Sequence, residues 1–524
     1  MTDALSAAGR RFAIGAPHAE ATAAGLAAFD EGGNAVDAAL AAATTLAVVY
    51  PHMCGLGGDL IALVHESGGS TVVVNSTGAA PAAVDADALR AARRGMPTYG
   101  PHTVTVPGAV AGWWRLARHW SSLGFARALS PAIARAREGV PVARSLAATL
   151  AAQGERLLAD PGIAQVFAPA GTPLGEGERL VQPALAGTLE TIAEEGPSAV
   201  YGGEVGRRLV EHLRDLGSSV SPEDLEGHEA DLDSPVAGRF RDLDVSVPPP
   251  NSQGFVLLQI LAGIEHLGLD PDPLGPDAAA LAHLFRVASA DRDRHNADPR
   301  RARVPIGTLV DEGHVAALCD AVRDPGFGRP GPAGSGDTAA VVTVDGDGNA
   351  VSLVHSLFHG FGSGILEPRT GVILHNRGSG FTLDPSHPNA IAGGKRPAHT
   401  LMPVIVHRTG ELAAVSGTMG GAAHPQINAM TLIRALVLGL DPADAVAAPR
   451  WVVEPSSAAG TAPLVAEARV PAAVRGALRA AGYAVEILDP VSASVGHANL
   501  IRVASDGTLD AATDPRADGA AAAR

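Results

Sequence analysis

The hydrophobic pattern predicts two adjacent helices near the amino end of the chain. Residues 18–32 are rich in alanine and end at a glycine pair, which commonly stops a helix. Asn34 can cap the next helix, and residues 35–49 carry small apolar side chains around nearly the whole circumference. Pro51 then ends the pattern. We therefore expect the second helix to be buried on almost all sides.

A β-hairpin and a long helical region are predicted next. Residues 61–66 and 71–75 are β-prone and flank the turn sequence SGGS. Residues 108–235 have mostly helical periodicity, and so do residues 255–295. Between them, SVPPPNSQG (residues 246–254) must be irregular because its prolines break both kinds of element.

The character of the chain changes after residues 322–337, which are rich in glycine and proline and predict a linker. Short β-prone runs separated by turn sequences follow, and they predict a sheet with a few helices in the last third of the chain. The first two thirds, in contrast, are expected to be mostly helical. The closing DGAAAAR (residues 518–524) reads as a frayed tail.

Composition and charge narrow the class of protein. Hydrophobic residues make up 46% of the 524 residues but aromatic residues only 4%, which favours tight packing of helices on sheets. The net charge of −16 and the lack of a dense Lys/Arg cluster argue against a nucleic-acid partner. Two distant cysteines provide neither a disulfide framework nor a zinc motif. With no apolar leader and no run of about 18 apolar residues, we expect a cytoplasmic protein without a membrane span.

Thr338 is a candidate nucleophile because it opens a β-prone run directly after the linker. A threonine hydroxyl needs a base to become reactive. If the bond between Asp337 and Thr338 were cut, Thr338 would gain an α-amine, whose reference pKa is about 7.7–8.0, and that amine could take the hydroxyl proton. The pattern alone favours an ordinary strand threonine, because threonine is common in strands.

Two glycine-rich turns are candidate anion sites. SGTMGG (residues 416–421) lies between a predicted strand and a predicted helix, where free backbone N–H groups could hold an oxyanion. A tight turn that needs glycine for backbone reasons explains this turn as well. CGLGGD (residues 54–59) lacks the GxxxxGK[ST] pattern and its lysine, which argues against an ATP site.

Segments spread along the chain, from about residue 13 to residue 519, resemble the γ-glutamyltranspeptidase family. The matching segments are EGGNAVDAALAAATTLAVVYPHMCGLGGD (31–59), TVTVPGAVAGW (103–113), PPNSQG (249–254), Asp337–Thr338, VDGDGNAVS (344–352), FGSGI (361–365), GVILHN (371–376), KRPAHTLMP (395–403), SGTMGG (416–421), APRW (448–451) and ATDPRADG (512–519). Any one of these segments is unspecific, but together they are highly specific.

The resemblance implies the α/β, four-layer αββα sandwich of N-terminal nucleophile hydrolases. It implies that the precursor cleaves itself between Asp337 and Thr338 into a large subunit, residues 1–337, and a small subunit, residues 338–524, which remain one globular unit. It also implies site residues: Thr338 as nucleophile, Gly420 and Gly421 as oxyanion-hole glycines, Ser356 as a supporting hydroxyl, and Asn376 near the substrate.

The sequence departs from the family where γ-glutamyl enzymes hold the free amino-acid end of their substrate. The large-subunit arginine before an Ala-Pro pair is missing from residues 76–81, and the Asp-Asp pair is missing from residues 377–381. The family's asparagine after the second hydroxyl is Phe358, and its paired serines are His399 and Thr400. The resemblance therefore implies a retained catalytic apparatus with a different substrate pocket.

Five residues are candidates for that pocket: Asn376, Arg377, Phe358, His399 and Thr400. Arg377 could bind a carboxylate or keto oxygen from a new direction, or it could be a structural arginine that bonds a loop carbonyl. His399 could contact substrate, or it could be a satisfied core histidine. These departures are similar to an oxamate amidohydrolase-like branch of the family.

We therefore expect a self-processing amidohydrolase or acyltransferase that cleaves a small acyl amide through an acyl-Thr338 intermediate, and not a standard γ-glutamyl substrate. Three alternatives remain open: a true γ-glutamyl hydrolase or transferase with a rebuilt pocket, a hydrolase of a C–C bond next to a carbonyl, and an uncut homologue with a binding role. No metal or organic cofactor is implied. The expected partners are a small-molecule amide and the two subunits of one precursor, and a further homo-oligomer stays open.

Overall fold

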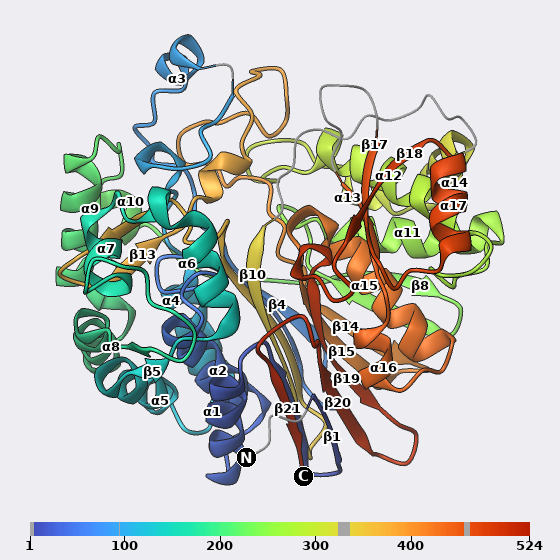
Figure 1. Ribbon diagram of the computed structural model, residues 1–524, viewed down its shortest axis with the longest axis horizontal. Helices are drawn as coiled ribbons and strands as arrows, with labels where there is room; N and C mark the ends of the chain where they lie inside the picture. Colours follow the sequence, from blue (N-terminus) through green and yellow to red (C-terminus); the bar gives the residue numbers. More distant parts are fainter. Residues whose placement is uncertain (1–4, 94, 323–335, 455–461) are drawn as a thin grey trace.

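Two antiparallel sheets of seven strands each pack face to face at the centre of the molecule (Figure 1). The computed structural model describes residues 5–93, 95–322, 336–454 and 462–524. One sheet has the strand order β21 (Ala520–Ala523), β2 (Phe12–Ala16), β10 (Asp337–Asp345), β11 (Ala350–Phe358), β3 (Asp59–His65), β4 (Thr71–Ser76) and β7 (Asp231–Asp233). The other has the order β1 (Ser6–Gly9), β20 (Leu509–Thr513), β19 (His497–Val503), β15 (Glu411–Met419), β14 (Val404–Arg408), β9 (Leu243–Val247) and β8 (Val236–Phe240).

Side chains alternate between two cores along the central strands. On β10, Ala339 and Val341 belong to the core under the first helix layer, whereas Ala340 and Val342 belong to the core between the sheets. Both faces are apolar because the sheet is covered on both sides. This explains why the strand reads as a continuous apolar run and not as an alternating one.

A helix layer covers the outer face of the β10 sheet (Figure 1). Its main members are α1 (Ala19–Asp30), α2 (Ala35–Val49), α4 (Ala109–Trp120), α5 (Phe125–Glu138), α6 (Arg144–Leu157), α7 (Pro161–Phe167), α8 (Pro183–Glu195) and α9 (Glu204–Asp215). Every residue of α2 is buried, and Asn34 caps it in a capping box with Asp37. Both expectations for this helix are confirmed.

A second helix layer covers the outer face of the other sheet (Figure 1). It contains α11 (Gly254–Leu267), α12 (Ala278–His295), α13 (Ile306–Leu309), α14 (Glu312–Val322), α15 (His424–Leu432), the π-helical turn Ile433–Val437, α16 (Pro442–Ala447) and α17 (Ala472–Ala480). Together the layers form the expected four-layer αββα sandwich.

Segments before and after residue 337 are interleaved within each sheet. In the first sheet, β10 pairs with β2 on one side, and β11 pairs with β3 on the other. In the second sheet, β14 pairs with β9. A cut before residue 338 would therefore leave two chains that share both sheets.

Two expectations from the sequence need correction. Residues 520–523 are not frayed, because they form edge strand β21 and pair with β2. The first two thirds of the chain are less helical than expected, since they supply seven strands of the two large sheets. Most of the predicted linker, residues 323–335, lies outside the described residues.

The remaining elements are short or peripheral. They are α3 (Ala86–Ala92), α10 (Pro222–Glu226), the strand pairs β5 (Val140–Pro141) with β6 (Arg179–Leu180) and β12 (Ile365–Glu367) with β13 (Val372–Leu374), and a sheet of β16 (Trp451–Val453), β17 (Ala462–Glu467) and β18 (Tyr483–Leu488). Among the described residues, no helix is long and apolar enough to cross a membrane.

Candidate active site

Thr338 lies at the start of β10, where the pairing between β10 and β11 is irregular. The register of the two strands shifts between residues 337 and 339, which leaves one extra residue on β11. Such bulges bend a strand and redirect its side chains. Thr338 is only 1% exposed, and the irregularity brings Ser356 of β11 beside it.

The hydroxyl of Ser356 connects Thr338 to the peptide bond that precedes it. Thr338 Oγ1 donates to Ser356 Oγ at 3.1 Å, and Ser356 Oγ donates to the carbonyl oxygen of Asp337 at 2.7 Å. The N–H of Phe358 and Nη2 of Arg377 donate to the same hydroxyl at 2.8 and 3.4 Å. A hydroxyl has a single proton, so these donors direct it to the carbonyl. Ser356 can therefore polarise that carbonyl and orient the threonine hydroxyl at once.

The residues just before Thr338 lie against the glycine turn that follows β15. A Cβ built on Gly336 would be 3.0 Å from Cα of Gly421 and 3.2 Å from the carbonyl oxygen of Phe358. Burial raises the pKa of the Asp337 carboxyl to about 6, although a hydrogen bond from the Gly360 backbone opposes the rise. The uncut chain therefore occupies the space beside the turn.

The glycine turn has the strand–turn–helix form that the sequence predicts. β15 ends at Met419 and α15 begins at His424. Gly420 and Gly421 have φ angles of 151° and 54°, in the left-handed region that side chains make costly. The turn lies just before the amino end of α15, the positive end of the helix, where an anion is favoured.

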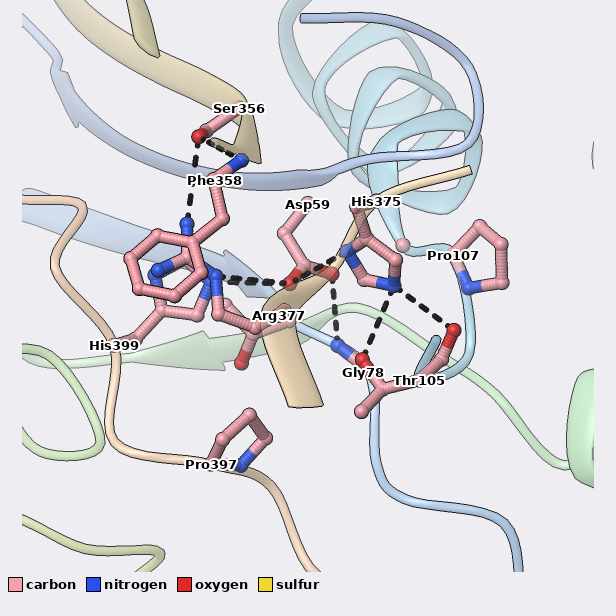
Figure 2. A network of polar contacts seen from close by, with 12 residues as sticks. Asp59, Gly78, Thr105, Pro107, Ser356, Phe358, His375, Arg377, Pro397 and His399 are labelled. Atoms are coloured by element: carbon pink, nitrogen blue, oxygen red, sulfur yellow. Dashed lines mark hydrogen bonds and ion pairs between the residues drawn. The ribbon is translucent and has the colours of Figure 1, made fainter. Parts of the chain in front are cut away.

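Arg377 is a fully buried cation beside Ser356 (Figure 2). Its guanidinium lies over the ring of Phe358, 3.9 Å from the centroid, and Nη1 donates to Thr400 Oγ1 at 3.0 Å. Its Nε has no hydrogen-bond partner among the described residues and is 3.9 Å from Asp59 Oδ2. Burial lowers the pKa of Arg377 to about 9, and the negative charge of Asp59 opposes this shift. Arg377 therefore has spare N–H donors beside the Ser356 hydroxyl, and these could bind an oxygen atom.

Asp59 anchors a buried polar network behind Arg377 (Figure 2). Its Oδ1 accepts the Gly78 N–H at 3.0 Å, and its Oδ2 accepts Nε2 of His399 at 3.0 Å. Nδ1 of His399 accepts the Leu401 N–H at 3.2 Å, so the proton of neutral His399 must be on Nε2. His375 completes the network, with Nδ1 3.4 Å from Asp59 Oδ2.

The charges of this network nearly balance. Burial alone would raise the pKa of Asp59, but the two histidines outweigh burial and hold the pKa well below its usual range. Burial and the nearby cationic Arg377 together lower the pKa of His399 to about 3, although Asp59 opposes the shift. At neutral pH, Asp59 is therefore ionised beside the cationic Arg377, and His399 is neutral.

The other predicted pocket residues differ in whether they contact Arg377. Phe358 and Thr400 contact Arg377 directly. Asn376 instead donates from Nδ2 to the Thr98 carbonyl oxygen at 2.7 Å, and its Nδ2 lies 2.7 Å from Nδ1 of His359. Both ring nitrogens of His399 have protein partners. Arg377, in contrast, keeps an Nε donor that no described residue accepts.

Sequence reasoning missed four polar residues of this region: Asp59, His375, His424 and Gln253. Asp59 was assessed only as part of a phosphate loop, although a lone acid that begins the apolar strand DLIALVH is itself a signal for a buried partner. His424 is fully buried, and neither ring nitrogen has a hydrogen-bond partner in the described part of the chain.

Within the described part of the chain, no group of three or more His, Cys, Asp or Glu residues could hold a metal ion.

Comparison with known proteins identifies close relatives over the full length. The family model described as Gamma-glutamyltranspeptidase matches residues 21–524. The oxamate amidohydrolase proenzyme of Klebsiella pneumoniae is 36% identical over 97% of both chains, and the glutathione hydrolase-like YwrD proenzyme of Bacillus subtilis is 35% identical over 98% of both. The crystal structure of cephalosporin acylase from Bacillus halodurans matches with a TM-score of 0.92 and 30% identity, over 99% of this chain and 97% of that one.

Proposed function

The chain belongs to the gamma-glutamyltranspeptidase family of self-processing N-terminal nucleophile hydrolases, and we propose that it hydrolyses a short acyl amide whose acyl group carries an anionic or keto oxygen. Thr338 is the nucleophile, and it can attack a substrate only after the chain has cut itself before this residue. The observation that carries the proposed substrate class is the buried guanidinium of Arg377, which has spare N–H donors one side chain away from Thr338.

Maturation proceeds as an acyl shift within the uncut chain. Thr338 Oγ1 attacks the carbonyl carbon of Asp337, the C–N bond breaks as the ester C–O bond forms, and the hydroxyl proton passes to the nitrogen. Ser356 supports this step because it donates to the carbonyl oxygen that gains negative charge. Water then hydrolyses the ester, which leaves a carboxylate on Asp337 and a free amine on Thr338.

Turnover uses the amine that maturation creates. The Thr338 amine takes the hydroxyl proton as Oγ1 attacks the substrate carbonyl, and it later gives that proton to the leaving amine. The N–H groups of Gly420 and Gly421 hold the oxyanion. Water then attacks the acyl ester, again with the amine as base, and releases the acid. Departure of residues 336–337 from the glycine turn opens the acyl site.

The charges around Arg377 favour an acyl group that has a carboxylate or keto oxygen but no ammonium group. A free γ-glutamyl group would need an acid for its ammonium as well as a cation for its carboxylate. Asp59 is the acid nearest to Arg377 in the described network, and Gly78 and His399 already occupy its oxygens. An unpaired ammonium in this buried site would be costly.

The relatives are compatible with this assignment. The 36% identical Klebsiella pneumoniae protein is named for oxamate, in which a carboxylate is bonded directly to the amide carbonyl. A carboxylate in that place would reach the Arg377 side of the site while the carbonyl faces Thr338. A relative named as a glutathione hydrolase is 30% identical, which makes γ-glutamyl amides the competing substrate class.

A substrate panel on fully processed protein tests the proposal. Oxamate, succinamate, acetamide and γ-glutamyl-p-nitroanilide would be compared by their kcat/KM values, with release of ammonia or nitroaniline as the signal. We expect oxamate or succinamate to exceed acetamide by about 10–100-fold, since hydrogen bonds to charged groups contribute about 1.5–3 kcal/mol. A higher kcat/KM for the γ-glutamyl anilide than for either carboxylate amide would overturn the substrate class.

A further inference from the structure

The proposed oxyanion turn is fixed from outside by a residue far away in the sequence. Gly420 and Gly421 both have positive φ angles, and inside the turn the Ala423 N–H bonds the carbonyl oxygen of Gly420 at 2.9 Å. The carbonyl oxygen of Gly421 points to the second helix layer, where it accepts Nε2 of Gln253 at 2.9 Å. An external donor therefore determines how the second half of the turn is oriented.

Gln253 bridges two loops of the site with one amide group. It precedes α11, at the end of the irregular segment that the prolines predict, and it is fully buried. Besides Gly421, its Nε2 donates to the carbonyl oxygen of Thr400 at 2.9 Å. Thr400 in turn binds Arg377 through its hydroxyl. The same NH₂ group thus fixes the position of the proposed oxyanion turn relative to the loop that supports Arg377, the proposed substrate-binding cation.

The orientation of this amide is not ambiguous. Arg292 of α12 donates from Nη1 to Gln253 Oε1 at 3.1 Å, and a guanidinium can only donate. The two carbonyl oxygens on the other side can only accept. Arg292 also donates to the carbonyl oxygen of Ala422 at 2.9 Å and forms an ion pair with Asp293 at 2.6 Å. Two consecutive carbonyls of the turn are therefore held by this pair of side chains.

We propose that Gln253 is a positioning residue for acyl transfer, which it supports by fixing the glycine turn at the spacing the oxyanion requires. The inference rests on the proposed function, because the turn has a catalytic role only if Thr338 forms an acyl-enzyme. Gln253 lies in the segment before the cleavage point, so after maturation the large subunit orients the oxyanion site of the small one. Displacement of a preorganised donor weakens transition-state binding more than substrate binding.

The extent of maturation distinguishes a positioning role of Gln253 from a general role in holding the fold together. The carbonyl attacked during maturation belongs to Asp337, and Ser356 holds its oxygen. Among the described residues, the side-chain hydrogen bonds of Gln253 go to Thr400, Gly421 and Arg292, and none goes to Ser356 or Asp337. Loss of Gln253 should therefore leave the cut intact and slow the turnover that follows, whereas a collapsed fold would impair both.

The test compares Gln253→Leu and Gln253→Glu with the matched control Gln259→Leu. Gln259 is also buried in α11, and its Nε2 makes two hydrogen bonds, to Asp291 Oδ2 at 2.7 Å and to the Leu309 carbonyl oxygen at 2.9 Å, away from the site. Glutamate at position 253 keeps the acceptor for Arg292 but loses both donated hydrogen bonds. The readouts are the fraction cut, the melting temperature, and kcat and KM for the best panel substrate.

We expect both Gln253 variants to mature fully and to lose about 10–100-fold in kcat, with KM changed less than about threefold. Gln259→Leu should lose melting temperature but keep its kcat. Equal kcat values for the Gln253→Leu and Gln259→Leu proteins, or a Gln253 effect on KM alone, would overturn the positioning role.

A generic acylating agent keeps this test independent of the substrate class. p-Nitrophenyl acetate would be reacted with each processed protein, and acetylation of the fragment beginning at Thr338 would be followed by mass spectrometry. Wild-type acetylation with no turnover of any panel amide would reject the substrate class only, and the variants would still be ranked by acetylation rate. No acetylation of the wild-type fragment would reject Thr338 as nucleophile, and the positioning role with it.

Discussion

Ser356 Oγ donates to the carbonyl oxygen of Asp337 at 2.7 Å while it accepts the hydroxyl of Thr338 at 3.1 Å. In the uncut chain, one atom thus holds both the hydroxyl and the carbonyl that the proposed maturation step joins. This arrangement depends on the irregular pairing of β10 with β11, which brings Ser356 to Thr338.

Replacement of Ser356 by alanine should therefore slow maturation. The Asp337 carbonyl would lose its donor and the Thr338 hydroxyl its orientation, so we expect the cleavage rate to fall about 100-fold or more. A time course on denaturing gels measures the rate. Ser352→Ala is the matched control, because Ser352 is a buried serine of the same strand whose hydroxyl bonds the Ser416 carbonyl at 2.7 Å. Equal cleavage rates for the two variants would contradict this role for Ser356.

Arg377→Gln should affect substrates according to their charge. Glutamine cannot form a charge-assisted bond to a carboxylate, so kcat/KM for oxamate or succinamate should fall about 10–100-fold. Turnover of the neutral acetamide should fall much less. Arg434→Gln serves as the control, since Arg434 is equally buried but bonds the Pro449 carbonyl oxygen. A uniform loss for charged and neutral amides would show that Arg377 acts only through the fold.

Buried neutral histidines should make the protein sensitive to acid. His355 is fully buried without a hydrogen-bond partner in the described structure, and burial lowers its pKa from 6.5 to about 3. The unfolded chain therefore binds a proton that the folded chain does not, so the free energy of unfolding falls as pH drops from about 6.5 towards 3. We expect His355→Phe to reduce this slope by up to about 1.4 kcal/mol per pH unit. Denaturant titrations that give identical slopes would contradict the assignment.

Asp337 should have the opposite effect to His355 on the pH dependence of stability: in the uncut protein, its contribution to the free energy of unfolding falls as pH rises. Burial raises its pKa from 3.8 to about 6, so the folded chain retains a proton that the unfolded chain loses. Its contribution to stability is present below pH 3.8 and is lost as pH rises through 6. In an uncut Thr338→Ala background, we expect Asp337→Asn to become progressively more stabilising across that window. Melting curves with a constant difference between the two proteins would refute this.

The local elements of the fold could be predicted because their signals are local. The cap at Asn34, the hairpin around SGGS and the strand–turn–helix at residues 416–424 each follow from neighbouring residues. Edge strand β21 was missed because its four alanines have no strand signal, and tertiary contacts such as the pairing with β2 order them.

The site was harder to predict because it is assembled from distant segments. His399 and Asp59 are 340 residues apart, and Gln253 and Gly421 are 168 residues apart. No spacing rule connects such pairs, since the tertiary fold brings their segments together. Thr338 itself could be distinguished from an ordinary strand threonine only through the family resemblance.

The proposed turnover requires Thr338 to lie at a new amino terminus. The most direct measurement is N-terminal sequencing, with intact mass, of the fragments from purified active protein. We predict a small fragment that begins TAAVVTVD and ends at residue 524, and a Thr338→Ala protein that stays in one piece. Active protein without that fragment, or a Thr338→Ala protein cut at the same place, would contradict the account.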